Sequence, residues 1–78
     1  MKLWHIWQEV NNNYDTFDSA VVAANTEEVA RNTHPGGYPP SDWPDYSWAP
    51  VADVKVEMIG TAKPGTKAGV IVASFNAG

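Results

Sequence analysis

The clearest alternation of hydrophobic and polar residues lies in residues 52–60, where Val54, Val56 and Met58 alternate with charged residues. This period of two is typical of a β-strand with one face buried and the other in water. After a turn with the sequence KPGTK, an uncharged apolar run over residues 69–75 predicts the last strand of the chain. Because a proline and a glycine between two such runs indicate a turn, the pattern predicts that these two strands form an antiparallel hairpin.

The N-terminal part of the chain predicts another pair of strands. In residues 2–10 the apolar side chains of Trp4, Ile6 and Val10 share one face, while a leucine and a second tryptophan lie on the other. Aromatic and branched residues with this spacing favour a strand with one buried face and one partly covered face. A turn follows in NNNYDTF, whose asparagines and aspartate tolerate left-handed backbone, and the chain then returns in a short strand over residues 18–24. The small side chains of that strand leave room for another element to pack closely above it.

One short helix is predicted over residues 26–33. Asn25 or Thr26 can cap its N-terminus, and a glutamate three residues after Asn25 can close a capping box. The helix has to end before the proline that follows, because the residue before a proline avoids helical backbone angles. Its predicted core contacts are Val29 and Ala30, and this small apolar area means that the helix depends on the sheet for stability.

These elements predict an α+β fold: a small antiparallel sheet of about four strands with one short helix packed on one face. The 78 residues are expected to form a single domain, residues 1–78. A chain of this size lies near the limit at which one hydrophobic core offsets the conformational entropy lost on folding.

A proline- and aromatic-rich tract, residues 34–50, separates the helix from the last two strands. Its sequence is HPGGYPPSDWPDYSWAP, with five of the six prolines, two of the four tryptophans and two of the three tyrosines. Proline lacks a backbone donor and fixes φ, so the tract is predicted to be a loop. Its aromatic rings either cover the core or form a recognition surface. Trp43 and Trp48 are the better candidates for covering the core, and Tyr38 and Tyr46 for exposure.

Acidic residues dominate the middle of the chain. The net charge is −4, and eight of the nine acidic residues lie between Glu9 and Asp53, a range that contains one basic residue, Arg31. This distribution argues against direct binding of nucleic acid, since a phosphate backbone requires several cations. It suits docking onto a basic protein surface. The alternative is that the acidic residues only keep the protein soluble.

No catalytic or cofactor-binding motif is present. The chain has no cysteine, no GxSxG, no glycine-rich dinucleotide motif and no phosphate loop. We therefore expect no enzymatic activity, no cofactor and no metal site. His34 follows the predicted helix and is expected to satisfy its last carbonyl groups. One alternative is a hydrolase that uses His34 with Asp15 or Asp18. A second alternative is a nucleotide-binding site formed by Arg31 and His34.

Three segments carry a family resemblance. They are YDTFDSAVVAANTEEVARNTHP (residues 14–35), IGTA (residues 59–62) and GVIVASFNAG (residues 69–78). Together they cover most of the chain, and they resemble a group of small proteins found in phages and prophages that also end in ASFNAG. The chain departs from the group's pattern at Val29, where members often carry another acid. The resemblance implies a phage setting, in which small acidic proteins often bind and block host machinery, including nucleic-acid-guided immunity.

The function predicted on this basis is that of a non-enzymatic phage-type accessory protein. It is expected to act by stoichiometric binding, through an acidic and aromatic surface, and to inhibit a bacterial defence complex of the CRISPR type or a related one. The expected partner is a host protein with a basic surface, and the alternative is a small-molecule sponge that sequesters a nucleotide immune signal. The residues expected at the partner surface are all acidic or aromatic: Tyr14, Asp15, Asp18, Tyr38, Asp42, Trp43, Asp45, Tyr46 and Trp48.

The protein is expected to act in the cytoplasm of the host cell and to make no membrane contact. The N-terminal residues lack the continuous apolar run of a signal peptide, and no segment approaches the length of a membrane span. The pattern leaves the oligomeric state open, and the free strand edges allow a homodimer in which residues 69–75 pair with a copy of themselves.

Overall fold

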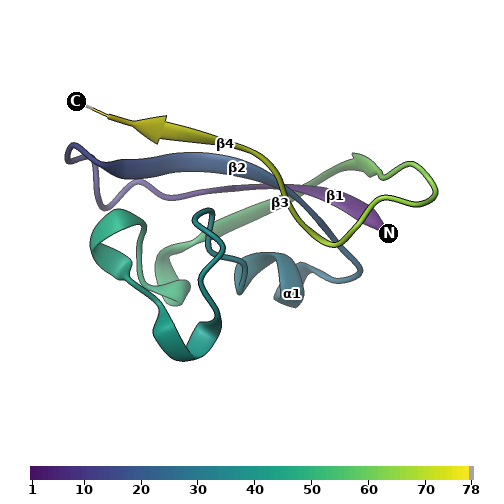
Figure 1. The fold of residues 1–78 in the computed structure, drawn as a ribbon, viewed down its shortest axis with the longest axis horizontal. Coiled ribbons are helices and arrows are strands. Elements are labelled where there is room, and N and C mark those ends of the chain that lie inside the picture. Colours follow the sequence, from purple (N-terminus) through teal and green to yellow (C-terminus); the bar gives the residue numbers. More distant parts are fainter. Residues whose placement is uncertain (78) are drawn as a thin grey trace.

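Four antiparallel strands form one sheet, and the remaining elements cover only one of its faces (Figure 1). The computed structural model describes residues 1–77. Its strands are β1 (Lys2–Trp7), β2 (Thr16–Ala24), β3 (Lys55–Thr61) and β4 (Gly69–Asn76). The covering layer consists of helix α1 (Glu27–Arg31) and three 3-10 turns, η1 (Pro40–Asp42), η2 (Asp45–Ser47) and η3 (Val51–Asp53). The predicted α+β class is confirmed.

The strand order is β3-β1-β2-β4, so the predicted hairpin of the last two strands is wrong. Strand β3 pairs with β1, and β4 pairs with β2 on the opposite side of the sheet. The loop between them runs along the end of the sheet, where the Ala62 amide donates to the Met1 carbonyl at 2.9 Å. A turn between two apolar runs occurs both in a hairpin and in a connection from one edge of the sheet to the other, so the local sequence does not distinguish the two. Strands β1 and β2 take the centre of the sheet and carry its buried side chains, whereas β3 and β4, with exposed or half-buried side chains, form its edges.

The core lies between the sheet and the covering layer. Its buried side chains come from β1, β2, α1, the tract and the end of η3: Trp4, Ile6, Ala20, Val22, Ala24, Ala30, Trp48 and Val54. The alanines of β2 are fully covered, which is where the predicted close packing above this strand occurs. Small side chains at these positions let the large ring of Trp48 approach the sheet directly.

Strand β1 ends at Trp7 rather than at the predicted residue 10, and Gln8 is the reason. The buried Gln8 side chain accepts hydrogen bonds from the amides of Val10 and Asn11, at 2.9 and 2.8 Å, and so turns the chain out of the strand. Val10, predicted to lie in the core, is therefore exposed. Asp15 adopts the left-handed backbone expected in this turn, with φ of 61°.

Helix α1 has only five residues, Glu27–Arg31, and is shorter than predicted. Thr26 is its N-cap and accepts a hydrogen bond from the Val29 amide, so the capping box with Asn25 does not form. Ala30 is fully buried, as predicted, but Val29 points into solvent because the short helix presents only one residue squarely to the sheet. Within residues 1–77 no helix has the length and hydropathy needed to cross a membrane.

Strand β3 begins at Lys55, three residues later than predicted, because the chain first forms η3. Val54, at the end of that turn, is buried against the core, whereas Met58 on the outer half of β3 is more than half exposed. The predicted strand over residues 69–75 is confirmed as β4.

Candidate functional site

The proline-rich tract folds back over the sheet and closes the core. Trp48 is fully buried, with no exposed surface, and lies in the main cluster. Trp43 is half-buried against the same cluster, and its indole nitrogen donates to the Ala49 carbonyl at 2.7 Å. The prediction that Trp48 contacts a partner is therefore wrong, because its ring lies in the core and has no exposed surface.

His34 lies within the tract of residues 34–50, which we call the lid because it covers the core. Its ring is buried, Nδ1 accepts the Gly36 amide at 2.9 Å, and Nε2 lies 3.1 Å from the Pro44 carbonyl. Because Nδ1 accepts, the proton is on Nε2 and is donated to Pro44. The prediction that His34 caps the helix is wrong, since the helix has already ended at Arg31 with Asn32 as its C-cap. His34 instead joins two distant parts of the tract.

Aromatic rings surround the His34 imidazole, with centroids 5.1 to 6.4 Å away: Phe17, Tyr38, Trp43 and Trp48. Desolvation by these neighbours lowers the pKa of His34, an effect that the hydrogen bond to the Pro44 carbonyl partly opposes. Gly36 leaves room for the Tyr38 ring, because a Cβ there would lie 2.9 Å from that ring and would have to displace it. A buried ring with both nitrogens engaged has no access to a substrate, so the geometry offers no support for a hydrolase built on His34.

Asn11 joins the turn between β1 and β2 to the lid. Its side-chain amide donates to the carbonyls of Tyr46 and Trp48, at 2.9 and 3.2 Å. Gln8 holds the backbone of Asn11 from the other side, accepting its amide at 2.8 Å and donating to its carbonyl at 2.7 Å. These bonds fix the turn and η2 as one rigid end of the molecule.

Two exposed tyrosines and two aspartates belong to the two segments that Asn11 joins. Tyr14 and Asp15 belong to the turn, and Asp45 and Tyr46 belong to η2. Tyr14 and Tyr46 are 74% and 75% exposed, the highest values among the large apolar residues described. The ion pairs within residues 1–77 are Glu27–Arg31 and Glu9–Lys55, so neither aspartate is neutralised. We call Tyr14, Asp15, Asp45 and Tyr46 the acidic tyrosine surface.

Three further predicted partner residues are exposed outside these two segments. Tyr38 packs edge-on against His34 and keeps part of its ring in solvent, and Asp42 is exposed on η1. Asp18 is exposed on β2, with its carboxylate 3.5 Å from the Ser74 hydroxyl of β4. The structure therefore divides the predicted set into the acidic tyrosine surface, these outlying residues and the two tryptophans of the lid.

Arg31 and His34 do not form a common ligand site. The Arg31 guanidinium donates to the Val54 carbonyl and lies 4.0 Å from the Glu27 carboxylate, while both nitrogens of His34 are engaged within the tract. Among residues 1–77 no group of three or more histidine, aspartate or glutamate side chains is placed to hold a metal ion.

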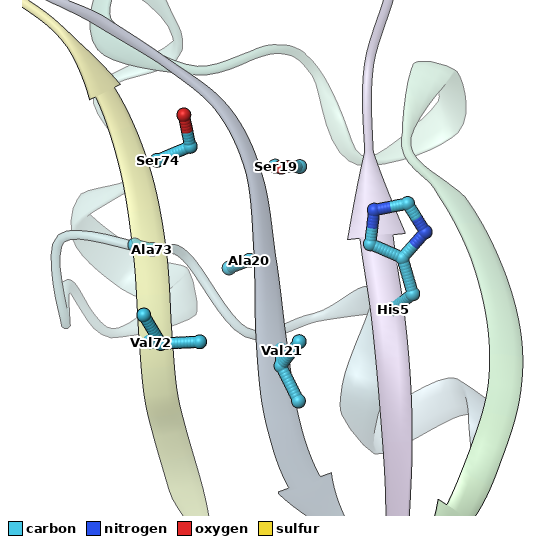
Figure 2. Close-up of a pocket in the computed structure, with 7 residues that line it drawn as sticks. All are labelled: His5, Ser19, Ala20, Val21, Val72, Ala73 and Ser74. Carbon is cyan, nitrogen blue, oxygen red and sulfur yellow. The ribbon is translucent and has the colours of Figure 1, made fainter.

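The uncovered face of the sheet carries a surface that the sequence pattern indicated only in part. His5 and Trp7 stack there with ring centroids 4.7 Å apart, because alternate residues of β1 point to this side. A shallow pocket of about 270 Å³ opens on this face. Figure 2 shows the uncharged side chains of β1, β2 and β4 that line it: His5, Ser19, Ala20, Val21, Val72, Ala73 and Ser74. The odd-numbered apolar residues of β1 indicated in the sequence that this face is apolar. We expected another part of the chain to cover it in part. Within residues 1–77 no helix or loop covers it.

Comparisons with protein-family models, with curated proteins and with solved structures found no match to this chain. The functional argument therefore depends on the surfaces themselves.

Proposed function

We propose that this protein is a non-enzymatic binding protein, which attaches stoichiometrically to a basic surface of a partner protein through the acidic tyrosine surface. One observation carries the proposal. The most exposed tyrosines of the described chain, Tyr14 and Tyr46, belong to the two segments that Asn11 ties together, and each adjoins an aspartate that no ion pair neutralises.

Tyrosine is well suited to such a contact. Its ring supplies a large contact area with few rotatable bonds, and it is enriched among the residues that contribute most to binding at protein interfaces. The Asn11 bonds to η2 reduce the conformational entropy that binding would cost, because the backbone below Tyr46 is already ordered. The aspartates add long-range attraction to a positive surface and repel a negative one.

The biological setting that we propose is that of a phage-type accessory protein. A basic surface on a bacterial defence complex of the CRISPR type or a related one often serves to hold nucleic acid, and an acidic protein docked there would compete with the phosphate backbone. The resemblance of residues 14–35 and 69–78 to small phage proteins supports this setting.

The nucleotide-sponge alternative has less support. A phosphate requires nearby cations or free amide groups. The pocket on the open face is lined by uncharged side chains, and Arg31 is already engaged with Val54 and Glu27.

The test compares the wild type with the double variant Tyr14→Ala/Tyr46→Ala and with a matched control, Val29→Ala. Val29 is an exposed apolar residue on α1, outside the proposed surface. Tagged forms of all three are used to capture proteins from a bacterial host lysate, and any protein retained by the wild type is purified and titrated by calorimetry. We expect a 1:1 complex whose dissociation constant rises at least about 30-fold in the double variant.

Salt provides a second readout. Because the aspartates are exposed, raising the salt concentration from 50 to 500 mM should weaken the complex by screening the charges. Equal affinity of the wild type and the double variant for the captured protein would contradict the proposal. So would turnover of a substrate by the protein alone.

A further inference from the structure

The two edges of the sheet differ in chemistry. Strand β3, at one edge, alternates charged residues with apolar ones and carries Lys55 and Glu57. Strand β4, at the other edge, contains no charged residue, and its exposed apolar side chains are Val70, Ile71, Val72 and Phe75. Natural sheets usually protect a free edge with charges, prolines or a covering segment, because the edge presents unpaired backbone groups to other strands. The β3 edge is protected in this way and the β4 edge is not.

The backbone of β4 is suitable for further pairing. Its register with β2 is interrupted twice, by an extra residue of β4 at Ile71 and by an extra residue of β2 at Asp18, and Val72–Ser74 pairs regularly between the two. In residues 1–77 only β2 pairs with this strand, and Figure 1 shows β4 along a free border of the sheet. The outward amide and carbonyl groups of this run are therefore open to another strand.

Charges near the two ends of β4 have opposite sign. Lys63 and Lys67 precede the strand in the loop from β3, where there is no acidic residue. Two aspartates flank its far end: the Asp15 amide donates to the Asn76 carbonyl at 2.6 Å, and the Asp18 carboxylate lies 3.5 Å from the Ser74 hydroxyl. An antiparallel copy of the same strand would place the lysine end of each chain against the aspartate end of the other.

We infer that β4 pairs antiparallel with β4 of a second copy of this chain. The pair has a two-fold axis at Val72, so that each Val72 lies opposite its copy, and it joins the two sheets into one continuous sheet of eight strands. The second copy is the occupant that the charges select, because the two-fold axis satisfies both ends of the strand at once. Edge pairing alone buries less than about 1,200 Å² in total, which is typical of weak association. The dimer therefore has a dissociation constant in the micromolar range.

Sedimentation equilibrium of the full chain at 5 to 500 μM tests this dimer. The decisive variant is Val72→Lys, which brings two lysines together at the axis. The matched control is Met58→Lys on β3, since the two side chains are similarly exposed, at 60% and 52%. We expect the wild type and Met58→Lys to dimerise alike, and Val72→Lys to stay monomeric up to 500 μM while keeping its circular dichroism spectrum.

A charge exchange tests the antiparallel register even if Val72→Lys fails to fold. Lys67→Glu is expected to raise the dissociation constant about 10-fold, and Lys67→Glu/Asp18→Lys to restore it, because each pair of unlike charges is re-formed with the signs reversed. Hydrogen exchange should in addition slow at the backbone amides of residues 72–75 on dimerisation. Packing through the open face would leave these amides unchanged.

A wild type that is monomeric at 500 μM would overturn the inference, and would leave the edge to a strand of a different protein. A dimer broken by Met58→Lys but not by Val72→Lys would overturn it as well. None of these variants alters Tyr14 or Tyr46, so failure here leaves the proposed binding function intact.

Discussion

The two faces of the sheet are built from the same strands, but one face is covered and the other is open. On β1, Trp4 and Ile6 are buried beneath α1 and the tract, while His5 and Trp7, which alternate with them, stack on the open side. The difference lies in what covers each face rather than in how apolar the residues are. The five-residue helix contributes a single buried side chain, so the core is sealed mainly by a loop in which Trp48 acts as the covering element.

The largest expected effect is on the covered face. Trp48→Ala should lower the free energy of unfolding by about 3–5 kcal/mol, since it removes the largest buried side chain and leaves a cavity. The matched change on the open face, Trp7→Ala, should cost about 1 kcal/mol or less, because that ring is already partly in water. Urea denaturation followed by circular dichroism measures both. Equal losses would show that the two faces do not differ as described.

The next effect concerns the junction between the lid and the sheet. Asn11→Ala should cost about 1–3 kcal/mol, because it removes the hydrogen bonds to the Tyr46 and Trp48 carbonyls. Asn12 is exposed and has no such bonds, so Asn12→Ala should change stability by less than about 0.5 kcal/mol. The same denaturation experiment compares the two. If Asn11→Ala is as mild as Asn12→Ala, the rigid junction proposed for partner binding is absent.

The two histidines sharpen the comparison through pH. Burial lowers the pKa of His34 below its ordinary value of 6.5, so the unfolded chain takes up this proton at a higher pH than the folded protein does. The contribution of neutral His34 to the free energy of unfolding is therefore fully present above about pH 6.5. Below that pH the free energy of unfolding should fall, with a slope of at most about 1.4 kcal/mol per pH unit for one proton.

His5→Gln, on the open face, serves as the control for that measurement. It should keep the pH dependence between pH 6.5 and 4.5, while His34→Gln should be less stable at neutral pH and show a flatter profile in the same range. The two variants differ only in which face of the sheet loses its histidine. If the free energy of unfolding of His5→Gln were independent of pH while that of His34→Gln still fell steeply, the pH dependence would have to be assigned to His5 instead of His34.

Much of the fold was predictable from local pattern. The period of two located β1 and β3, an apolar run located β4 and the return of the chain after a turn located β2, while the prolines excluded a helix from the tract. The strand boundaries were less predictable, because the Gln8 side chain competes with the sheet for the amides of Val10 and Asn11. No periodicity reveals such a side-chain contact in advance.

The candidate site was predictable in composition but not in arrangement. Tyrosines and acidic residues were expected at the surface, and Tyr14, Asp15, Asp45 and Tyr46 lie there. Their gathering at one end depends on Asn11 reaching residues more than thirty positions away, which only the folded chain shows.

By itself, the sequence determined that this chain forms strands, one short helix and a non-helical aromatic tract, because these follow from contacts between near neighbours along the backbone. The tertiary structure decided the order of the strands, the burial of Trp48 and His34 and the exposure of the second face. Each of these is a competition for a limited buried volume between segments far apart in the chain. Such a competition is settled by packing, and local pattern carries no record of its outcome.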